Sequence, residues 1–264
     1  MKQFVTSVYK SIFQRKQLYK LNRFIFWLSS IGVGMPTDGN DVRKSDESFL
    51  KMVLRSSANP TVLDIGANVG NYASQVMQIS PKAQVFAFEP HPKTFKQLEA
   101  TANKTGFAAF NLACSDQPGT LQLFDYADND GSEHASLYKE VIEKVWSSNS
   151  NTWDVSVITV DHFIEENNLS KVDLLKVDTE GSELRVLLGA KQSIDSGIIS
   201  AIQFEFNAMN VVTRVYFRDF YDLLPMYDFY RMSPGGLLPL GPYQAFVYEQ
   251  FVLQNIVALR KPPK

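Results

Sequence analysis

The sequence predicts an α/β fold with a mostly parallel sheet, preceded by a helical N-terminal extension. Three observations predict it. From residue 61 onward, short apolar runs alternate with segments of helical character. A glycine-rich turn follows the first apolar run directly, and acidic residues follow the second run and a later one. Strands and helices that alternate over short connections are typical of parallel sheets with helices on both faces.

The alternation can be followed in order along the chain. We expect strands at 61–64, 84–88, 108–113, 172–178 and 201–206, and helices at 71–79, 94–104, 182–188 and 217–226. Pro81 stops the first helix and Gly106 closes the second. Two further extended runs, 228–232 and 251–259, are expected to form an antiparallel hairpin at the sheet edge.

The alternation breaks after the third strand. Two extended segments, 119–126 and 153–160, flank a polar stretch at 128–151. Excursions of this kind often carry substrate specificity. We therefore divide the chain into a helical extension at residues 1–45 and one domain at residues 46–264, with a substrate-side excursion at about 119–160.

The composition is that of an ordinary globular protein, since 45% of the 264 residues are hydrophobic and 20% are charged. A formal net charge of −2 gives no general electrostatic reason to expect a nucleic-acid partner. The single cysteine, Cys114, excludes an internal disulfide and a multi-cysteine zinc site. We expect a cytoplasmic protein, because a reducing compartment is the default for a chain without disulfides.

The first 35 residues are basic and partly amphipathic. Six positive charges and no acidic residue precede Asp38. Apolar residues between Phe4 and Phe13 recur at three- and four-residue spacing, as on one face of a helix. The apolar run 24–35 is too short to span a bilayer, which needs about 20 apolar residues. Three interpretations stay open: a helix that covers the domain or a partner subunit in a homo-oligomer, peripheral membrane contact through residues 1–35, and a targeting signal.

The strongest motif is VLDIGANVGNY, at residues 62–72. A buried strand ends at Asp64, and Gly66 and Gly70 then let the backbone turn tightly and approach a ligand before a helix begins. The dinucleotide fingerprint G-x-G-x-x-G has a middle glycine where this chain has Asn68. An acidic entrance without a close-approach glycine suits a cofactor without phosphates. S-adenosylmethionine fits, because its ammonium and sulfonium groups are positive.

Acidic residues at two further strand ends extend this site. Glu89 ends the second strand 19 positions after Gly70, where a carboxylate can accept hydrogen bonds from both ribose hydroxyls. Asp116, after the third strand, can accept a hydrogen bond from the adenine amino group. It can equally form a turn into Pro118 and Gly119, and the sequence leaves both interpretations open.

The fourth motif is KVDTEGSEL, at residues 176–184. Its acids gather at the carboxyl end of a strand, where open α/β sheets place ligands. A carboxylate there can face a cationic cofactor or take a proton from a substrate hydroxyl. We assign this role to Asp178 and Glu180, and helix capping to Glu183. Glu205 lies inside an apolar strand, so we expect it at the pocket or beside a cation.

These motifs together resemble the FkbM-type family, a branch of the class I S-adenosylmethionine-dependent methyltransferases. The resemblance covers residues 60–208 and rests on VLDIGANVGNY, FAFEPHP at 86–92, ACSD at 113–116 and LLKVDTEGSELRVLLGA at 174–190. It implies a Rossmann-like class I sheet and methyl transfer to a hydroxyl oxygen, often of a sugar or natural product. The family often has a Ser-Ser-Leu-like element in the excursion, where this chain has HASL at 134–137.

The candidate cofactor residues are Asp64, Gly66, Ala67, Asn68, Gly70, Tyr72, Glu89, Pro90, Ser115, Asp116 and Asp178. The candidate catalytic residues are Asp178, Glu180, Glu205 and His134, the last as a base from the polar excursion. Asp178 and Glu205 could instead bind one divalent metal ion. We expect a small-molecule or glycan acceptor with a hydroxyl group. Two other functions stay open: a nucleotide-dependent oxidoreductase and a catalytically inactive cofactor-binding subunit.

Overall fold

The computed structural model describes residues 2–35, 39–128, 131–132 and 134–262. Its main sheet contains β1 (Thr61–Ile65), β2 (Gln84–Phe88), β3 (Ala108–Phe110), β7 (Leu174–Val177), β8 (Ala201–Phe206), β9 (Tyr227–Ser233), β10 (Gly236–Pro239) and β11 (Gln254–Arg260). The strand order is β10-β9-β11-β8-β7-β1-β2-β3. The run from β8 to β3 is parallel, whereas β11, β9 and β10 pair antiparallel with their neighbours. The predicted α/β fold with a mostly parallel sheet is confirmed.

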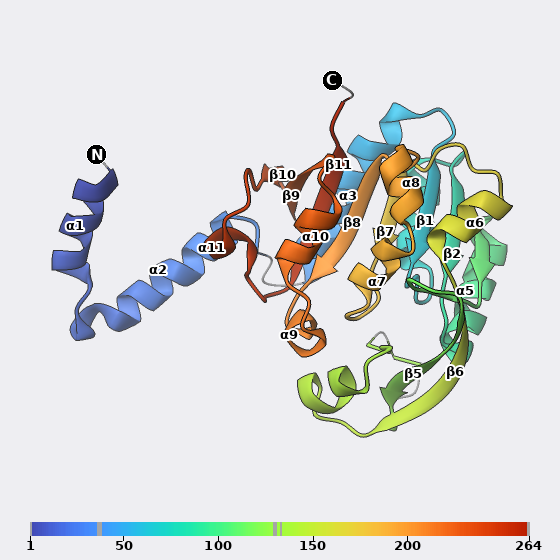
Figure 1. The fold of residues 1–264 in the computed structure, drawn as a ribbon, viewed down its shortest axis with the longest axis horizontal. Helices are drawn as coiled ribbons and strands as arrows, with labels where there is room; N and C mark the ends of the chain where they lie inside the picture. The colour runs from blue at the N-terminus through green and yellow to red at the C-terminus, as the bar shows by residue number, and fades with distance from the viewer. Residues whose placement is uncertain (1, 36–38, 129–130, 133, 263–264) are drawn as a thin grey trace.

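Helices cover both faces of this sheet (Figure 1). One face packs against α3 (Gly39–Val53), α4 (Asn71–Ile79) and α5 (Pro92–Thr105). The other packs against α6 (Val160–Glu166), α7 (Glu183–Leu188), α8 (Lys191–Ser196), α10 (Phe217–Leu223) and α11 (Ala245–Tyr248). The turn η2 (Leu54–Ser56) follows α3, and the short helix α9 (Met209–Thr213) follows β8.

The structure differs from the sequence prediction at two places in the main sheet. The strand expected at 108–113 is divided, because β3 ends at Phe110 and residues 113–114 pair with a different sheet. The C-terminal strands are antiparallel, as expected, but β11 lies inside the sheet between β8 and β9. The edge strand is β10, which pairs with β9 and which the sequence analysis did not predict.

The excursion forms a small second sheet. Its strands are β4 (Ala113–Cys114), β5 (Gly119–Tyr126) and β6 (Ser150–Ile158), in the order β4-β6-β5, with a π-helical turn at Val141–Val145. Four buried side chains give it a core of its own: Ala113, Leu123, Val155 and Val157. Residues 129, 130 and 133 of the polar stretch lie outside the described residues.

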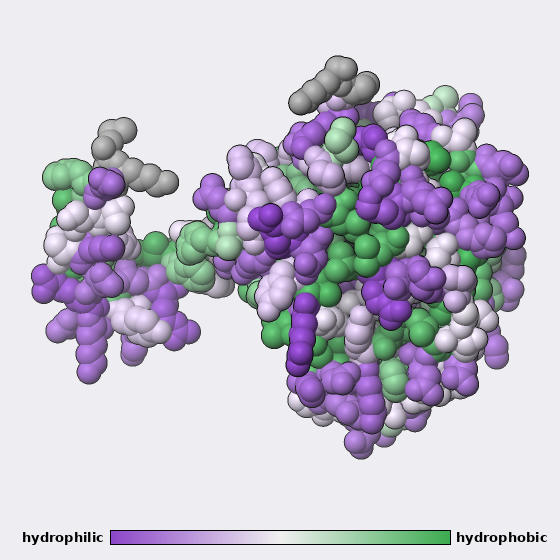
Figure 2. Space-filling model, viewed as in Figure 1, coloured by the Kyte–Doolittle hydropathy of each residue, from purple (hydrophilic) through white to green (hydrophobic). Residues whose placement is uncertain are grey.

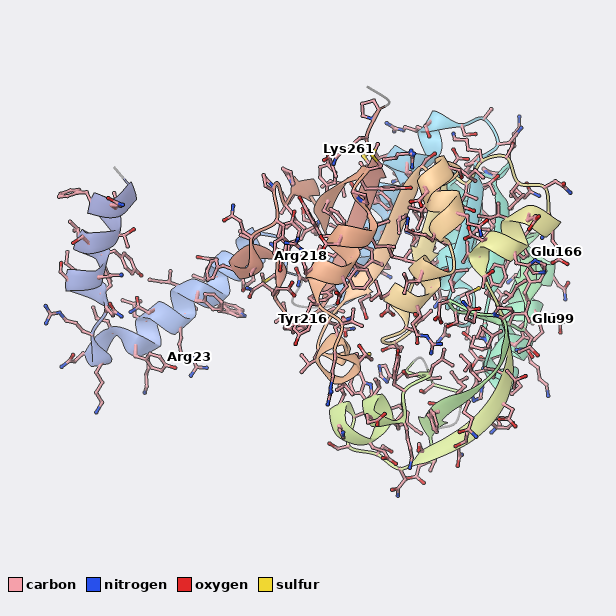
Figure 3. The ribbon with its side chains drawn as sticks, viewed as in Figure 1. Arg23, Glu99, Glu166, Tyr216, Arg218 and Lys261 are labelled. Carbon is pink, nitrogen blue, oxygen red and sulfur yellow. The ribbon has the colours of Figure 1, made fainter. Side chains whose placement is uncertain are left out.

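The N-terminal extension projects from the body as an arm (Figure 1). It contains α1 (Lys2–Phe13), the turn η1 (Lys16–Leu18) and α2 (Tyr19–Gly32), and α2 buries none of its residues. Apolar surface lies along α2 between the body and the outer end of the arm (Figure 2), and Arg23 lies on the outer part of α2 (Figure 3). α3 runs through residue 45, where the sequence analysis ended the extension, and packs on the sheet. Within the described residues, no helix is long and apolar enough to cross a membrane.

Gly189, which follows α7, lets the base of the excursion approach the main domain closely. A Cβ atom at this position would lie 2.1 Å from the carbonyl oxygen of Ser115. Because that oxygen belongs to the backbone, Gly189→Ala is expected to lower the free energy of unfolding by about 1–3 kcal/mol in urea denaturation. Gly235→Ala is the matched control, since its Cβ would meet nothing closer than 3.8 Å. It should change the same quantity by less than about 0.5 kcal/mol, and equal effects of both variants would contradict the contact.

Candidate cofactor and acceptor site

The neighbouring strands β1, β7 and β8 place three polar side chains in a row. The strand register pairs Asp64 with Lys176 and Lys176 with Gln203. Residues in register on parallel strands point to the same face of the sheet. Two positions earlier, the same face is buried apolar core, formed by Val62, Leu174 and Ala201. On this face of the sheet, each strand therefore has an apolar core residue followed two positions later by a polar residue of the site.

Lys176 is the centre of this row. Its Nζ lies 3.3 Å from Asp64 Oδ1 and 3.4 Å from Asp178 Oδ2, and donates to the carbonyl oxygen of Gly66 at 3.3 Å. It also stands 5.3 Å from the centre of the Tyr72 ring. Burial alone would lower the pKa of Lys176, but the two carboxylates outweigh burial and raise this pKa above its usual value. The ammonium group therefore stays charged and holds both acids.

Asp64 is fully buried beside Lys176. Burial raises the pKa of Asp64, and the attraction of Lys176 opposes the rise. Lys176 Nζ lies 3.3 Å from Asp64 Oδ1, so the two groups form a buried ion pair. Asp64 is not among the residues that line the two cavities described below. It therefore lies behind the pocket rather than on its wall.

The loop after β1 is held against the ends of β2 and β7. The N–H groups of Gly66 and Ala67 donate to a carbonyl oxygen at the end of β2, at 3.0 and 2.9 Å. Gly66 has a φ of 77°, and a Cβ there would lie 1.8 Å from the carbonyl oxygen of Asp178, so the position requires glycine. Asn68 also has a positive φ, 49°, and its N–H donates to Glu89 Oε2 at 3.1 Å. The loop thus connects the acidic ends of β2 and β7.

Glu89 follows β2 and is only 7% exposed. Its carboxylate accepts hydrogen bonds from the N–H groups of His91, at 2.8 Å, and Asn68, at 3.1 Å. Burial raises the pKa of Glu89 to about 7, and these two hydrogen bonds oppose the rise. Near neutral pH, the Glu89 side chain therefore exists in both its ionised form, which only accepts hydrogen bonds, and its protonated form.

A narrow cavity extends from the loop after β1 to the excursion. Part of its wall is apolar and is formed by Leu112, Ala113, Cys114, Leu123 and Leu137. Glu89, Pro90 and Asp178 are among its other lining residues. An apolar slot beside a carboxylate suits a flat heteroaromatic ring joined to a sugar whose hydroxyls can donate hydrogen bonds. The chemistry of these residues suits an adenosine group, and the cavity, at about 50 Å³, has to widen to admit one.

Ser115 and Asp116 lie outside both cavities. Asp116 Oδ1 accepts hydrogen bonds from Ser115 Oγ at 2.9 Å and from Arg185 Nε at 2.8 Å. Neither residue is among those that line the two cavities. One oxygen of the Asp116 carboxylate is thus engaged by a side chain of α7, and the adenine contact suggested by its strand-end position stays a prediction.

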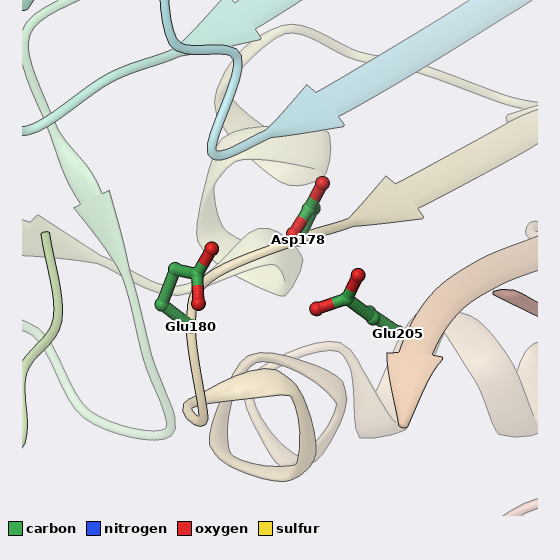
Figure 4. A group of neighbouring side chains, drawn as sticks. All are labelled: Asp178, Glu180 and Glu205. Carbon is green, nitrogen blue, oxygen red and sulfur yellow. The ribbon is translucent and has the colours of Figure 1, made fainter. Parts of the chain in front are cut away.

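A second, larger cavity of about 1090 Å³ begins at the same loop. Asp178 and Glu180 line both cavities, and Glu205 lines the larger one. The three side chains each offer a carboxylate oxygen, and these oxygens lie within 4.8 Å of one another (Figure 4). Burial, followed by the nearby Asp178 and Glu183, raises the pKa of Glu205 well above its usual value, while a hydrogen bond from Asn207 opposes the rise. Such a cluster can accept a proton near neutral pH or bind a hard cation.

Glu183 holds the loop that carries Glu180. Its buried carboxylate accepts hydrogen bonds from the N–H groups of Thr179, at 2.8 Å, and Gly181, at 3.1 Å. Between them, Glu180 has a φ of 55°, which L-residues rarely adopt. Glu183 therefore holds the loop before α7, because these hydrogen bonds go to that loop and not to the first N–H groups of the helix, where capping would place them.

His134 comes from the excursion and lines the larger cavity together with Trp146. Their rings stack with centres 4.1 Å apart, and His134 Nδ1 lies 3.0 Å from Tyr126 Oη. The excursion thus gives the cavity an aromatic wall. His134 is not a member of the three-carboxylate cluster.

The wall of the larger cavity contains a chain of hydrogen bonds that the sequence does not predict. Tyr72 Oη donates to Gln203 Oε1 at 2.6 Å, and Gln203 Nε2 donates to Asp46 Oδ1 at 2.9 Å. Burial raises the pKa of Asp46 to about 6, against the effect of this hydrogen bond. Gly70, with a φ of 88°, is the N-cap residue of the helix that carries Tyr72. Gln203 could have been found from its period-two spacing to Glu205, whereas no local motif marks Asp46.

A family model described as the methyltransferase FkbM domain matches residues 64–230. The chain belongs to the FkbM methyltransferase family. The matched segment begins at Asp64 and includes the glycine loop, Glu89 and all three members of the carboxylate cluster. The protein is therefore an S-adenosylmethionine-dependent methyltransferase, and the interpretation as a nucleotide-dependent oxidoreductase is set aside.

Three relatives illustrate the range of the family. The 2-O-methyltransferase NoeI of Sinorhizobium fredii is 26% identical over 78% of this chain and 86% of its own length. The hexuronic acid methyltransferase AglP of Haloferax volcanii is 30% identical over 58% of this chain and 59% of its own length. The 31-O-demethyl-FK506 methyltransferase FkbM of Streptomyces tacrolimicus is 26% identical over 56% of this chain and 66% of its own length.

Replacing Lys176 tests whether its charge holds the site together. Lys176→Met leaves the buried Asp64 without its cation, so the free energy of unfolding at pH 7 should fall by about 3–5 kcal/mol in denaturant titration. Without Lys176 the pKa of Asp64 rises further in the folded state. The deficit relative to the wild type should therefore be largest at neutral pH and shrink as the pH falls toward the usual pKa of an aspartate.

Two further variants control this experiment. Lys191→Met removes an exposed lysine from an i,i+4 pair with Asp195 and should cost less than about 0.5 kcal/mol. Adding Asp64→Asn to Lys176→Met should restore part of the lost stability, because the unpaired charge is then gone. Equal losses for Lys176→Met and Lys191→Met would show that the buried ammonium has no special role.

Proposed function

We propose that this methyltransferase transfers the methyl group of S-adenosylmethionine to a hydroxyl oxygen of a sugar or natural-product acceptor. The observation that carries the proposal is the position of the three-carboxylate cluster. Asp178 and Glu180 line both cavities, so the cluster lies where a cofactor in the narrow cavity would meet an acceptor in the larger one.

The narrow cavity is the proposed site for the adenosine part of the cofactor. Glu89 would accept hydrogen bonds from the ribose hydroxyls, while the apolar wall would contact the adenine ring. Asp178 would face the positively charged part of S-adenosylmethionine. Lys176, 3.4 Å behind Asp178, would neutralise part of the negative charge of this carboxylate. When bound, S-adenosylmethionine supplies a methyl group that its sulfonium has already activated. The protein then has to orient the acceptor and remove its proton.

The carboxylate cluster is proposed to accept this proton. A sugar-like hydroxyl is a weak nucleophile at neutral pH, so a nearby base contributes to the rate. Glu205 suits the role, because a carboxylate whose pKa is raised binds a proton more readily than an exposed one. The alternative is that Asp178, Glu180 and Glu205 bind one hard cation that polarises the hydroxyl, which their mutual distances also support.

The walls of the larger cavity support a polar, ring-shaped acceptor. Trp146 and His134 form an aromatic surface against which a sugar ring can pack, and Asn255 offers an amide group to hydroxyls. Two of the relatives are named for methylation at an oxygen, and a third for a hexuronic acid. Incubation with S-adenosylmethionine and a panel of hydroxylated glycosides, followed by mass spectrometry, tests the proposal. Methyl transfer to none of them would favour an inactive cofactor-binding subunit.

The raised pKa of Glu89 predicts a pH-dependent affinity for the cofactor. The free protein has a Glu89 pKa of about 7, and only the ionised form accepts hydrogen bonds from both ribose hydroxyls. The Kd of S-adenosylmethionine should therefore be about tenfold larger at pH 6 than at pH 8 in calorimetric titration. Glu89→Gln should bind weakly at both values, without this slope. Glu99→Gln, which changes an exposed acid on α5, should keep the wild-type profile. A flat profile in the wild type would rule out Glu89 as the ribose acceptor.

Asp178 and Glu205 should affect turnover more than cofactor affinity. Asp178→Asn and Glu205→Gln keep the shape of each side chain and remove its charge, so kcat should fall by about 10²- to 10⁴-fold. The double variant should lose less than the product of the single effects, because the two groups act on one hydroxyl. Glu166→Gln, at an exposed position (Figure 3), serves as the control.

A chelator titration of the wild type separates the two roles of the cluster. Activity that is lost with a chelator and restored by magnesium or calcium would make the three acids metal ligands. Activity that is insensitive to the chelator would make one of them the base. If Asp178→Asn kept the wild-type kcat with an acceptor that the wild type methylates, Asp178 would serve only to position the loop before α7.

A further inference from the structure

The arm formed by α1, η1 and α2 leaves a large apolar surface without cover. Its exposed hydrophobic side chains are Phe4, Val5, Val8, Tyr9, Ile12, Tyr19, Leu21, Phe24, Ile25, Phe26, Trp27, Leu28 and Val33. Soluble monomers rarely expose apolar groups in such a contiguous stretch, and surfaces of this kind usually mark a binding site. None of the residues that line the two cavities belongs to this arm.

The apolar residues of α1 lie on one side of the helix, whereas those of α2 surround most of it. In α1, Phe4, Val8 and Ile12 follow one another at four-residue spacing, and Lys10 lies on the other side of the helix. In α2, Phe24 and Leu28 share one side, but Phe26 lies on the opposite side with Arg23 and Ser30. α1 is therefore amphipathic, whereas α2 exposes apolar side chains around most of its surface, with Lys20 and Arg23 between them.

The corner between the two helices is fixed by side chains. Tyr9 Oη donates to Asn22 Oδ1 at 3.1 Å, and Asn22 Nδ2 donates to the carbonyl oxygen of Phe13 at 2.8 Å. The rings of Tyr9 and Phe13 stack with centres 4.7 Å apart. At the base of the arm, Arg231 donates to the carbonyl oxygen of Val33 at 3.5 Å. The first contacts fix the angle between α1 and α2, and the last one ties the end of the arm to β9.

The charge of the arm indicates what covers it. Five exposed cations accompany the apolar residues, at Lys10, Arg15, Lys16, Lys20 and Arg23. No acidic residue precedes Asp38, although the whole chain has a net charge of −2. A second arm would bring the same cations and no acid to pair with them. An anionic bilayer accepts both parts of this surface, because its headgroups attract the cations while its acyl region accepts the apolar side chains.

We propose that the α1–α2 arm binds the surface of an anionic lipid membrane. The apolar side chains of the helices enter the interface, the basic side chains contact the headgroups, and the catalytic domain remains in the water phase. Trp27 and Tyr19 suit this depth, because tryptophan and tyrosine are enriched where the acyl region meets the headgroups. The inference does not depend on the identity of the acceptor.

Cosedimentation of the full chain with vesicles tests the proposal. The wild type should bind vesicles of phosphatidylcholine with phosphatidylglycerol at least about tenfold more strongly than vesicles of phosphatidylcholine alone, and added salt should weaken the binding. Trp27 fluorescence should shift to shorter wavelength on binding, and the Trp27→Phe variant should lose that part of the shift. The triple variant K16Q/K20Q/R23Q should lose the preference for anionic vesicles. The triple variant F24S/W27S/L28S should lose binding to both kinds.

Matched controls change the body instead of the arm. Phe246→Ser, at a side chain that is 81% exposed, and Lys191→Gln should bind vesicles as the wild type does. All variants should keep the wild-type affinity for S-adenosylmethionine, which shows that the domain is folded. Failure of the wild type to bind anionic vesicles would overturn the proposal, and so would binding that survives both arm variants. Self-association of the wild type that F24S/W27S/L28S abolishes, without vesicle binding, would assign the arm to a second copy of the chain.

Discussion

The site depends on one buried ammonium group. Lys176 lies where β1 and β7 run side by side, within 3.4 Å of the carboxylates of Asp64 and Asp178, and it also holds the carbonyl of Gly66. Without this cation, the fully buried carboxylate of Asp64 would have no opposite charge beside it and would lie close to the carboxylate of Asp178, which is unfavourable. The charge on Lys176 therefore allows the glycine loop and the acidic end of β7 to lie against each other.

The two cavities keep an excess of negative charge even with Lys176 in place. Their lining residues include five acids, Asp46, Glu89, Asp178, Glu180 and Glu205, and two cations, Arg43 and Lys176. The raised pKa values of Asp46, Glu89 and Glu205 show that burial disfavours their ionised forms. A positively charged ligand relieves this, so the electrostatics that reduce the stability of the empty fold favour a sulfonium cofactor.

Local patterns in the sequence predict the elements, and the strand register decides what they do together. Period-two alternation and glycine turns locate β2, β8 and α4, and the acids at the strand ends indicate the edge that carries the site. The partners of these acids are not local. Arg185 contacts Asp116, which lies 69 residues earlier in the chain. Asp46 reaches the cavity from α3, which precedes all the recognisable motifs in the sequence. The outward course of the arm was equally hidden, because amphipathic spacing shows that a helix has an apolar side but not what covers it.

The shared wall of the two cavities has a kinetic consequence. Gly66, Asn68, Asp178 and Glu180 line both spaces. A molecule in the narrow cavity would therefore supply part of the boundary of the larger one. On the proposed assignment of the two cavities, the acceptor pocket is complete only after that boundary exists, so the two substrates should bind in a compulsory order, with the acceptor second. Product release should then run in reverse, with the methylated acceptor leaving before the spent cofactor, as in an ordered sequential mechanism rather than a random one.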